Sequence, residues 1–82
     1  NKMDEDEQFN QAFGEHTGIV EGCREWIWNI KNNNDDSTVI HLRSVDADLF
    51  TDLAWRLFGR YIANKSNLRK LGLDMCNYRR YL

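Results

Sequence analysis

The chain has 82 residues and a formal net charge of −2 at pH 7; 29% of its residues are charged and 41% hydrophobic, which is typical of one small globular domain. No apolar run approaches the roughly 20 residues that span a bilayer, and the acidic N-terminus lacks a signal peptide's apolar core, so we expect no membrane contact. Residues 1–36 carry nine acidic and three basic residues, whereas residues 37–82 carry four acidic and eight basic ones. The excess of basic residues in the second part is smaller than that of the dense basic stripe of a nucleic-acid binder.

Residues 1–18 form an acidic N-terminal segment. The four consecutive acids from Asp4 to Glu7 predict a solvated, frayed stretch. Phe9, Ala12 and Phe13 then give one apolar flank, typical of a short helix that ends at a glycine. We therefore expect this segment to be partly disordered or a short helix, separate from the region that follows at residues 19–82.

Two helices and two strands are expected after this segment. Apolar residues recur at steps of three and four from Ile19 to Ile30, which predicts a helix with a single apolar stripe, and the polar run at residues 31–37 ends it. The β-branched stretch TVIHLRSV, residues 38–45, predicts a strand. A connection, DADLFTD, offers Asp48 or Thr51 as the N-cap of a second helix over residues 53–63. A second strand is expected around residues 71–73, and the alternation of helices with strands predicts that the strands are parallel.

The helix, turn and strand repeat at an offset of 31 residues. Agreement in one ungapped register across all three elements indicates an internal duplication. The matched pairs are Trp26 with Leu57, Ile27 with Phe58, Ile30 with Tyr61, Asn33 with Asn64, Ile40 with Leu71, Leu42 with Leu73 and Val45 with Cys76.

The second unit resembles a leucine-rich repeat. Leu68, Leu71, Leu73 and Cys76 have the spacing of the motif LxxLxLxx(N/C), and the preceding WRLFGRYIANKSNL is similar to the helical side of a ribonuclease-inhibitor-like repeat. The resemblance implies an α/β fold: a fragment or end of a leucine-rich-repeat solenoid, with short parallel strands and helices on the convex side. About two repeats and the start of a third, NYRRYL, would fill residues 19–82.

The resemblance also has departures and consequences. Ser37 stands where the motif has leucine, and the period of 31 exceeds the usual range of about 20–29 residues. One such unit cannot bury its apolar face alone, so we expect adjoining repeats; an N-terminal residue that is Asn rather than Met also indicates a fragment. The expected strand-side core is Ile40, Leu42, Val45, Leu68, Leu71, Leu73 and Cys76, and the expected helix-side core is Trp26, Ile27, Ile30, Leu57, Phe58, Tyr61 and Ile62.

No motif in the sequence predicts catalysis, a cofactor or a metal site. The soft-metal ligands His16, Cys23, His41 and Cys76 lack CxxC or HxxxH spacing, and no GxSxG sequence or phosphate-binding glycine loop is present. Two cysteines are too few for a disulfide framework, and each lies among apolar residues, which favours free thiols in a reducing, cytoplasmic setting.

The predicted function is therefore that of a non-catalytic protein-interaction module. In the family that the sequence resembles, residues that alternate with the leucines contact protein partners on the concave strand face. In this chain the corresponding residues are Val39, His41, Arg43, Arg69, Lys70, Gly72, Asp74 and Met75. Their mildly basic character predicts an acidic protein partner. The alternative is a nucleic-acid-binding module that uses the basic C-terminal half, in which case affinity would fall steeply with salt.

Overall fold

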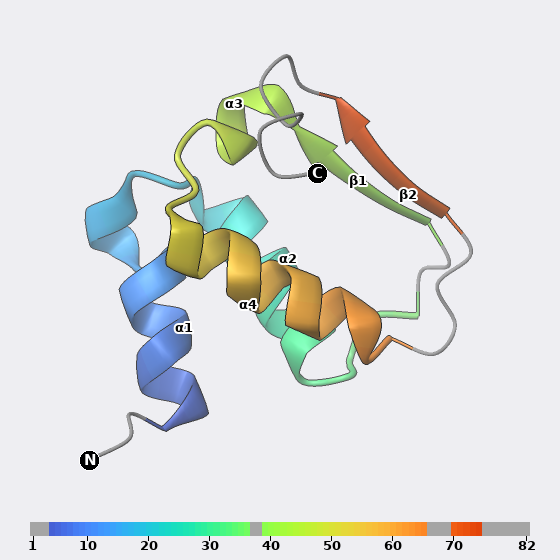
Figure 1. Ribbon diagram of the computed structural model, residues 1–82, viewed down its shortest axis with the longest axis horizontal. Helices are drawn as coiled ribbons and strands as arrows, with labels where there is room; N and C mark the ends of the chain where they lie inside the picture. The colour runs from blue at the N-terminus through green and yellow to red at the C-terminus, as the bar shows by residue number, and fades with distance from the viewer. Residues whose placement is uncertain (1–3, 37–38, 66–69, 75–82) are drawn as a thin grey trace.

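The computed structural model describes residues 4–36, 39–65 and 70–74, and these are mainly helical (Figure 1). The order helix, strand, helix, strand predicted after residue 18 is present, with additional helical elements before and within it. The elements are α1 (Glu5–Phe13), the 3₁₀ turn η1 (Glu15–Thr17), α2 (Glu21–Lys31), β1 (Val39–Arg43), α3 (Ser44–Ala47), α4 (Asp52–Ala63) and β2 (Lys70–Asp74).

Helix α1 begins within the acidic run that was predicted to fray. The Asp4 carboxylate accepts a hydrogen bond of 2.8 Å from the Glu7 backbone N–H, which caps the helix. The other acids of the run lie in the first turn, where the helix dipole favours negative charge. At the far end of α1, Phe13 has 0% of its surface exposed. The acidic segment is therefore attached to the core through its last turn.

Helices α2 and α4 have the apolar stripes that the sequence predicts. On α2, Cys23, Ile27 and Ile30 are buried. Helix α4 begins at the predicted cap Thr51, whose hydroxyl oxygen accepts a hydrogen bond of 3.2 Å from the Ala54 N–H. Both α1 and α2 pack against α4, so that α4 is central among the three long helices.

The two strands pair in parallel, in the register that the 31-residue offset predicts. Ile40 lies opposite Leu71, and Leu42 lies opposite Leu73. Figure 1 shows β1 and β2 side by side along one side of the molecule, with α1 on the opposite side of α4. The predicted adjacency and direction of these strands are thus confirmed.

The predicted fold class, an α/β leucine-rich-repeat solenoid fragment, is nevertheless wrong. The described residues form a mainly helical domain with one small pair of five-residue strands, and not a solenoid of stacked strand and helix layers. Its core is one hydrophobic cluster of aliphatic and aromatic side chains. The cluster includes Phe13 of α1, which lies outside the predicted repeats. The ring centroid of Phe13 lies 5.4 Å from that of Phe50 and 6.4 Å from that of Tyr61. The ring centroids of Phe50 and Phe58 are 5.7 Å apart.

A second correction concerns the end of the first strand. The extended structure predicted through Val45 stops at Arg43, and the chain turns into α3. This turn places Asp46 and Ala47 in the interior, so Val45 points outward and is 59% exposed instead of lining the core. An ion pair stabilises this turn, because Arg43 Nε lies 3.1 Å from Oδ2 of the buried Asp46 carboxylate.

The other predicted core residues divide into three groups. The first group is buried, as predicted, and consists of Ile27, Ile30, Leu42, Leu57, Phe58 and Tyr61. The second group, Trp26 and Ile62, is partly buried and packs against the core. The side chains of Ile40, Leu68, Leu71, Leu73 and Cys76 lie outside the part of the chain that the structure describes.

A buried ion pair ties the end of α4 to the turn that follows α2. The Lys65 ammonium donates a hydrogen bond of 2.6 Å to the Asp35 backbone carbonyl and lies 3.6 Å from the Asp35 carboxylate. The side chain of Lys65 is only 3% exposed, and that of Asp35 is 9% exposed. Because 30 positions separate the two residues in sequence, this pair fixes the two helix ends relative to one another.

Candidate functional site

Six of the eight predicted interface residues lie on the strand pair. Opposite positions of a parallel pair share one face, and the register places Val39 opposite Lys70, His41 opposite Gly72, and Arg43 opposite Asp74. The remaining two, Arg69 and Met75, lie outside the described residues. Within β1, His41 and Arg43 are exposed while Leu42 between them is buried. The strand therefore has the alternation expected of one solvated and one buried face, without the wide concave wall of a solenoid.

A groove of about 420 Å³ lies where β1 meets the N-terminal half of α2, and we call it the α2–β1 groove. It contains two of the predicted interface residues and adds a helical wall that the sequence did not associate with them. Its lining residues are Val20, Gly22, Cys23, Trp26, His41, Leu42, Arg43 and Asp46.

The polar side of this groove is an ordered network around Asp46. Arg43 Nε donates a hydrogen bond of 3.1 Å to Asp46 Oδ2, and the Arg43 side chain is 60% exposed whereas that of Asp46 is 6% exposed. The bond uses Nε, so the terminal N–H groups of the guanidinium can still recognise an anion. Asp46 thus holds Arg43 in place at the mouth of the groove.

The cysteine of the groove is not an activated nucleophile. Burial, followed by the Asp46 charge and a hydrogen bond to the Asp46 side chain, raises the pKa of the Cys23 thiol to about 12. Reactive cysteines require the opposite, a pKa lowered by positive surroundings. The groove therefore combines a thiol, an imidazole and a carboxylate without the electrostatics of a thiol-dependent catalytic site.

We expect Cys23 to react slowly with a thiol reagent such as DTNB while the chain is folded. In a Cys76→Ser background, the rate at about pH 8 should be about 10³-fold below that of an ordinary thiol, since only the thiolate reacts. Stopped-flow absorbance measures this rate, and unfolding the same variant in denaturant should restore the ordinary value. A folded thiol that reacts as fast as the unfolded one would contradict the electrostatic description of the groove.

Of the other two candidate metal ligands, Cys76 lies outside the described residues and His16 does not line the groove. His16 Nε2 lies 3.0 Å from the Gln11 carbonyl oxygen, beside α1. Among residues 4–36, 39–65 and 70–74, no three histidine, cysteine or acidic side chains are grouped so that they could hold a metal ion.

Exposed apolar side chains, of which Val20 lines the groove, are a feature that sequence reasoning missed. Val20 in the groove is 50% exposed, and Val45, next to Asp46, is 59% exposed. Leu49 is 42% exposed, and its side chain lies 4.0 Å from the position that a Cβ would take on Gly18. The predicted repeat assigned Val45 to the strand-side core. The early start of α3 after β1, which the sequence did not reveal, turns Val45 outward instead.

Comparison with known proteins finds no matching family model, curated protein or solved structure. In the part of the chain that the structure describes, every helix is too short or too polar to cross a membrane.

Proposed function

We propose that this chain is a non-catalytic protein-interaction module that binds an acidic partner protein in the α2–β1 groove. The observation that carries the proposal is the presence, in one groove, of the exposed Val20 side chain and the largely exposed Arg43 guanidinium. Large exposed apolar side chains beside a shaped groove are typical of protein contact sites. An arginine at the same groove gives such a contact charge selectivity.

The groove suits an extended peptide segment of the partner. Its lining includes the apolar side chains of Val20, Trp26 and Leu42 and the polar side chains of His41 and Arg43. A partner segment with an aliphatic residue next to Asp or Glu would place the aliphatic side chain against these apolar side chains. Its carboxylate would then accept hydrogen bonds from the Arg43 guanidinium, whose planar donors match carboxylate geometry.

The raised pKa of Cys23 argues against a thiol-dependent catalytic role for this groove. A buried free thiol also supports a reducing, cytoplasmic setting, in which cysteines stay unpaired.

Selection from a random peptide library displayed on phage tests this function. With the immobilised chain as bait, we expect enrichment of sequences in which Asp or Glu adjoins Leu, Ile or Val. Arg43→Gln and Val20→Asp should each weaken binding of a selected peptide by about tenfold or more. Glu15→Gln, an exposed charge that does not line the groove, is the matched control and should bind normally.

Two results would contradict the proposal. The first is a selected peptide whose affinity is the same for the wild type and Arg43→Gln, with circular dichroism confirming that the variant is folded. The second is failure to enrich acidic–aliphatic sequences together with binding of a single-stranded oligonucleotide whose affinity falls steeply with salt, which would favour the nucleic-acid alternative.

A further inference from the structure

A second pocket lies between α1 and α2 and shares no lining residue with the α2–β1 groove. We call it the α1–α2 pocket; it is lined by Phe9, Glu21, Arg24, Glu25 and Trp28. Its volume of about 200 Å³ is below the roughly 300–1,000 Å³ of sites for small-molecule ligands. A pocket of this size suits the end of a single side chain.

The aromatic wall of the pocket is fixed by the core. The rings of Phe9 and Trp28 meet edge to face with their centroids 5.0 Å apart. Phe9 also packs against the buried Phe13, at 5.2 Å. Trp28 remains 37% exposed, so it presents part of its indole to the outside from a constrained position.

The carboxylates of the pocket share one face of α2 with this indole. Glu21, Glu25 and Trp28 are separated by four and three positions, a spacing that places side chains next to one another on a helix. Both glutamates are exposed. Arg24 opposes their charge, so the three ionised side chains leave the pocket with a formal charge of −1. Arg24 Nε donates a hydrogen bond of 3.1 Å to the Ile19 carbonyl oxygen.

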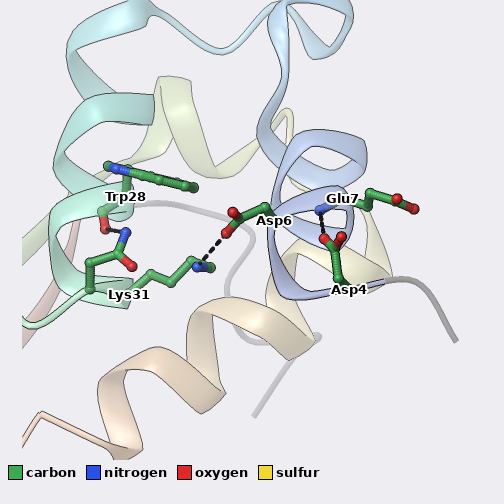
Figure 2. A network of polar contacts seen from close by, with 6 residues as sticks. Asp4, Asp6, Glu7, Trp28 and Lys31 are labelled. Carbon is green, nitrogen blue, oxygen red and sulfur yellow. Dashed lines mark hydrogen bonds and ion pairs between the residues drawn. The ribbon is translucent and has the colours of Figure 1, made fainter.

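An internal ammonium group demonstrates the chemistry that this surface prefers. Figure 2 shows Lys31 between Trp28 and Asp6, with its Nζ 4.7 Å from the centre of the indole ring and 2.9 Å from an Asp6 carboxylate oxygen. A cation above an indole and beside a carboxylate is a favourable arrangement. Lys31 does not line the α1–α2 pocket, so Phe9, Trp28 and the two glutamates offer a second place with the same chemistry.

We propose that the α1–α2 pocket binds the cationic end of a lysine or arginine side chain from a basic segment of a partner protein. The cation would lie against the exposed part of Trp28, with Glu21 and Glu25 neutralising its charge. This site is separate from the α2–β1 groove and prefers the opposite charge. The chain would therefore present two surfaces, one for an acidic segment and one for a basic segment.

Nuclear magnetic resonance titration of the intact chain tests the proposal. The probe is an eight-residue peptide of alternating lysine and glycine, and the reporter is the Trp28 indole N–H, assigned by its loss in Trp28→Phe. We expect saturable shifts of this resonance, and a fully acetylated peptide should bind at least about tenfold more weakly because it lacks the cations. Glu25→Gln should weaken binding about threefold, whereas Arg24→Gln should strengthen it by a similar factor.

Glu25→Gln and Arg24→Gln are expected to change peptide affinity in opposite directions, so the direction of each change decides the outcome. If Arg24→Gln weakens peptide binding, the pocket prefers an anion and the proposal is wrong. Glu7→Gln removes an exposed acid of α1 that does not line the pocket, so equal weakening by Glu7→Gln and Glu25→Gln would indicate diffuse attraction and also overturn the proposal. Arg43→Gln should leave lysine-peptide binding unchanged, which separates this result from the test of the α2–β1 groove.

Discussion

Replacing Phe13 with alanine should lower the free energy of unfolding by about 3–5 kcal/mol, the usual cost of deleting a fully buried aromatic side chain. Phe13 has no exposed surface and contacts the rings of Phe9, Phe50 and Tyr61. Small domains have a total stability of about 5–15 kcal/mol. Phe13→Ala should therefore lose most of its stability, as measured by urea denaturation followed by circular dichroism.

The matched control for this substitution is Val45→Ala. Val45 is 59% exposed, so its replacement should change stability by no more than about 0.5 kcal/mol. A solenoid restricted to residues 19–82 predicts the reverse order, because Val45 would then line the core and Phe13 would lie outside it. A large effect at Val45 with a small one at Phe13 would refute the helical core described above.

Replacing Lys65 with methionine should lower the free energy of unfolding by about 3–5 kcal/mol, the usual cost of removing one partner from a buried ion pair. The Asp35 side chain is only 9% exposed and its carboxylate lies 3.6 Å from the Lys65 ammonium. The substitution also removes the hydrogen bond of 2.6 Å that Lys65 donates to the Asp35 backbone carbonyl. Thermal and urea denaturation of Lys65→Met measure this loss. Arg60→Met, at an exposed position of α4, is the matched control and should stay within about 0.5 kcal/mol of the wild type.

A double-mutant cycle separates the ion pair from packing. Asp35→Asn removes the charge while keeping a polar side chain, so Asp35→Asn with Lys65→Met should be less destabilised than the sum of the single variants. We expect a coupling energy of about 0.5–3 kcal/mol. Strict additivity would mean that Lys65 stabilises the chain through its methylene groups and the backbone bond, and not through the charge of Asp35.

Local sequence patterns predicted the elements, but not the way in which they assemble. The stripe from Ile19 to Ile30, the cap at Thr51 and the 31-residue offset each depend on nearby residues or on simple repetition, and α2, α4 and the strand register agree with them. Assembly depends on contacts between distant positions. Phe13 looked like the end of a solvated segment because nothing local indicates that its ring meets Tyr61, 48 positions later.

The candidate site was predictable in part for the same reason. Alternation in β1 correctly assigned His41 and Arg43 to the solvated face. The contribution of Cys23 and Trp26 to the same groove required α2 to pack beside β1, which no spacing in the sequence specifies. Asp46 was expected in a polar connection, whereas in the structure its carboxylate is buried, paired with Arg43 and hydrogen-bonded to Cys23.

The contact between Phe13 and Tyr61 joins the first long helix to the last one, and this has a consequence for how the molecule unfolds. Among the described residues, aromatic rings from α1, from the segment before α4 and from α4 itself share one core, so α1 and α4 have no separate interiors. Fraying of α1 past Phe13 would open that interior to water at once. Denaturation should accordingly proceed as a single cooperative transition, without the stepwise loss of terminal units that is characteristic of linear repeat arrays.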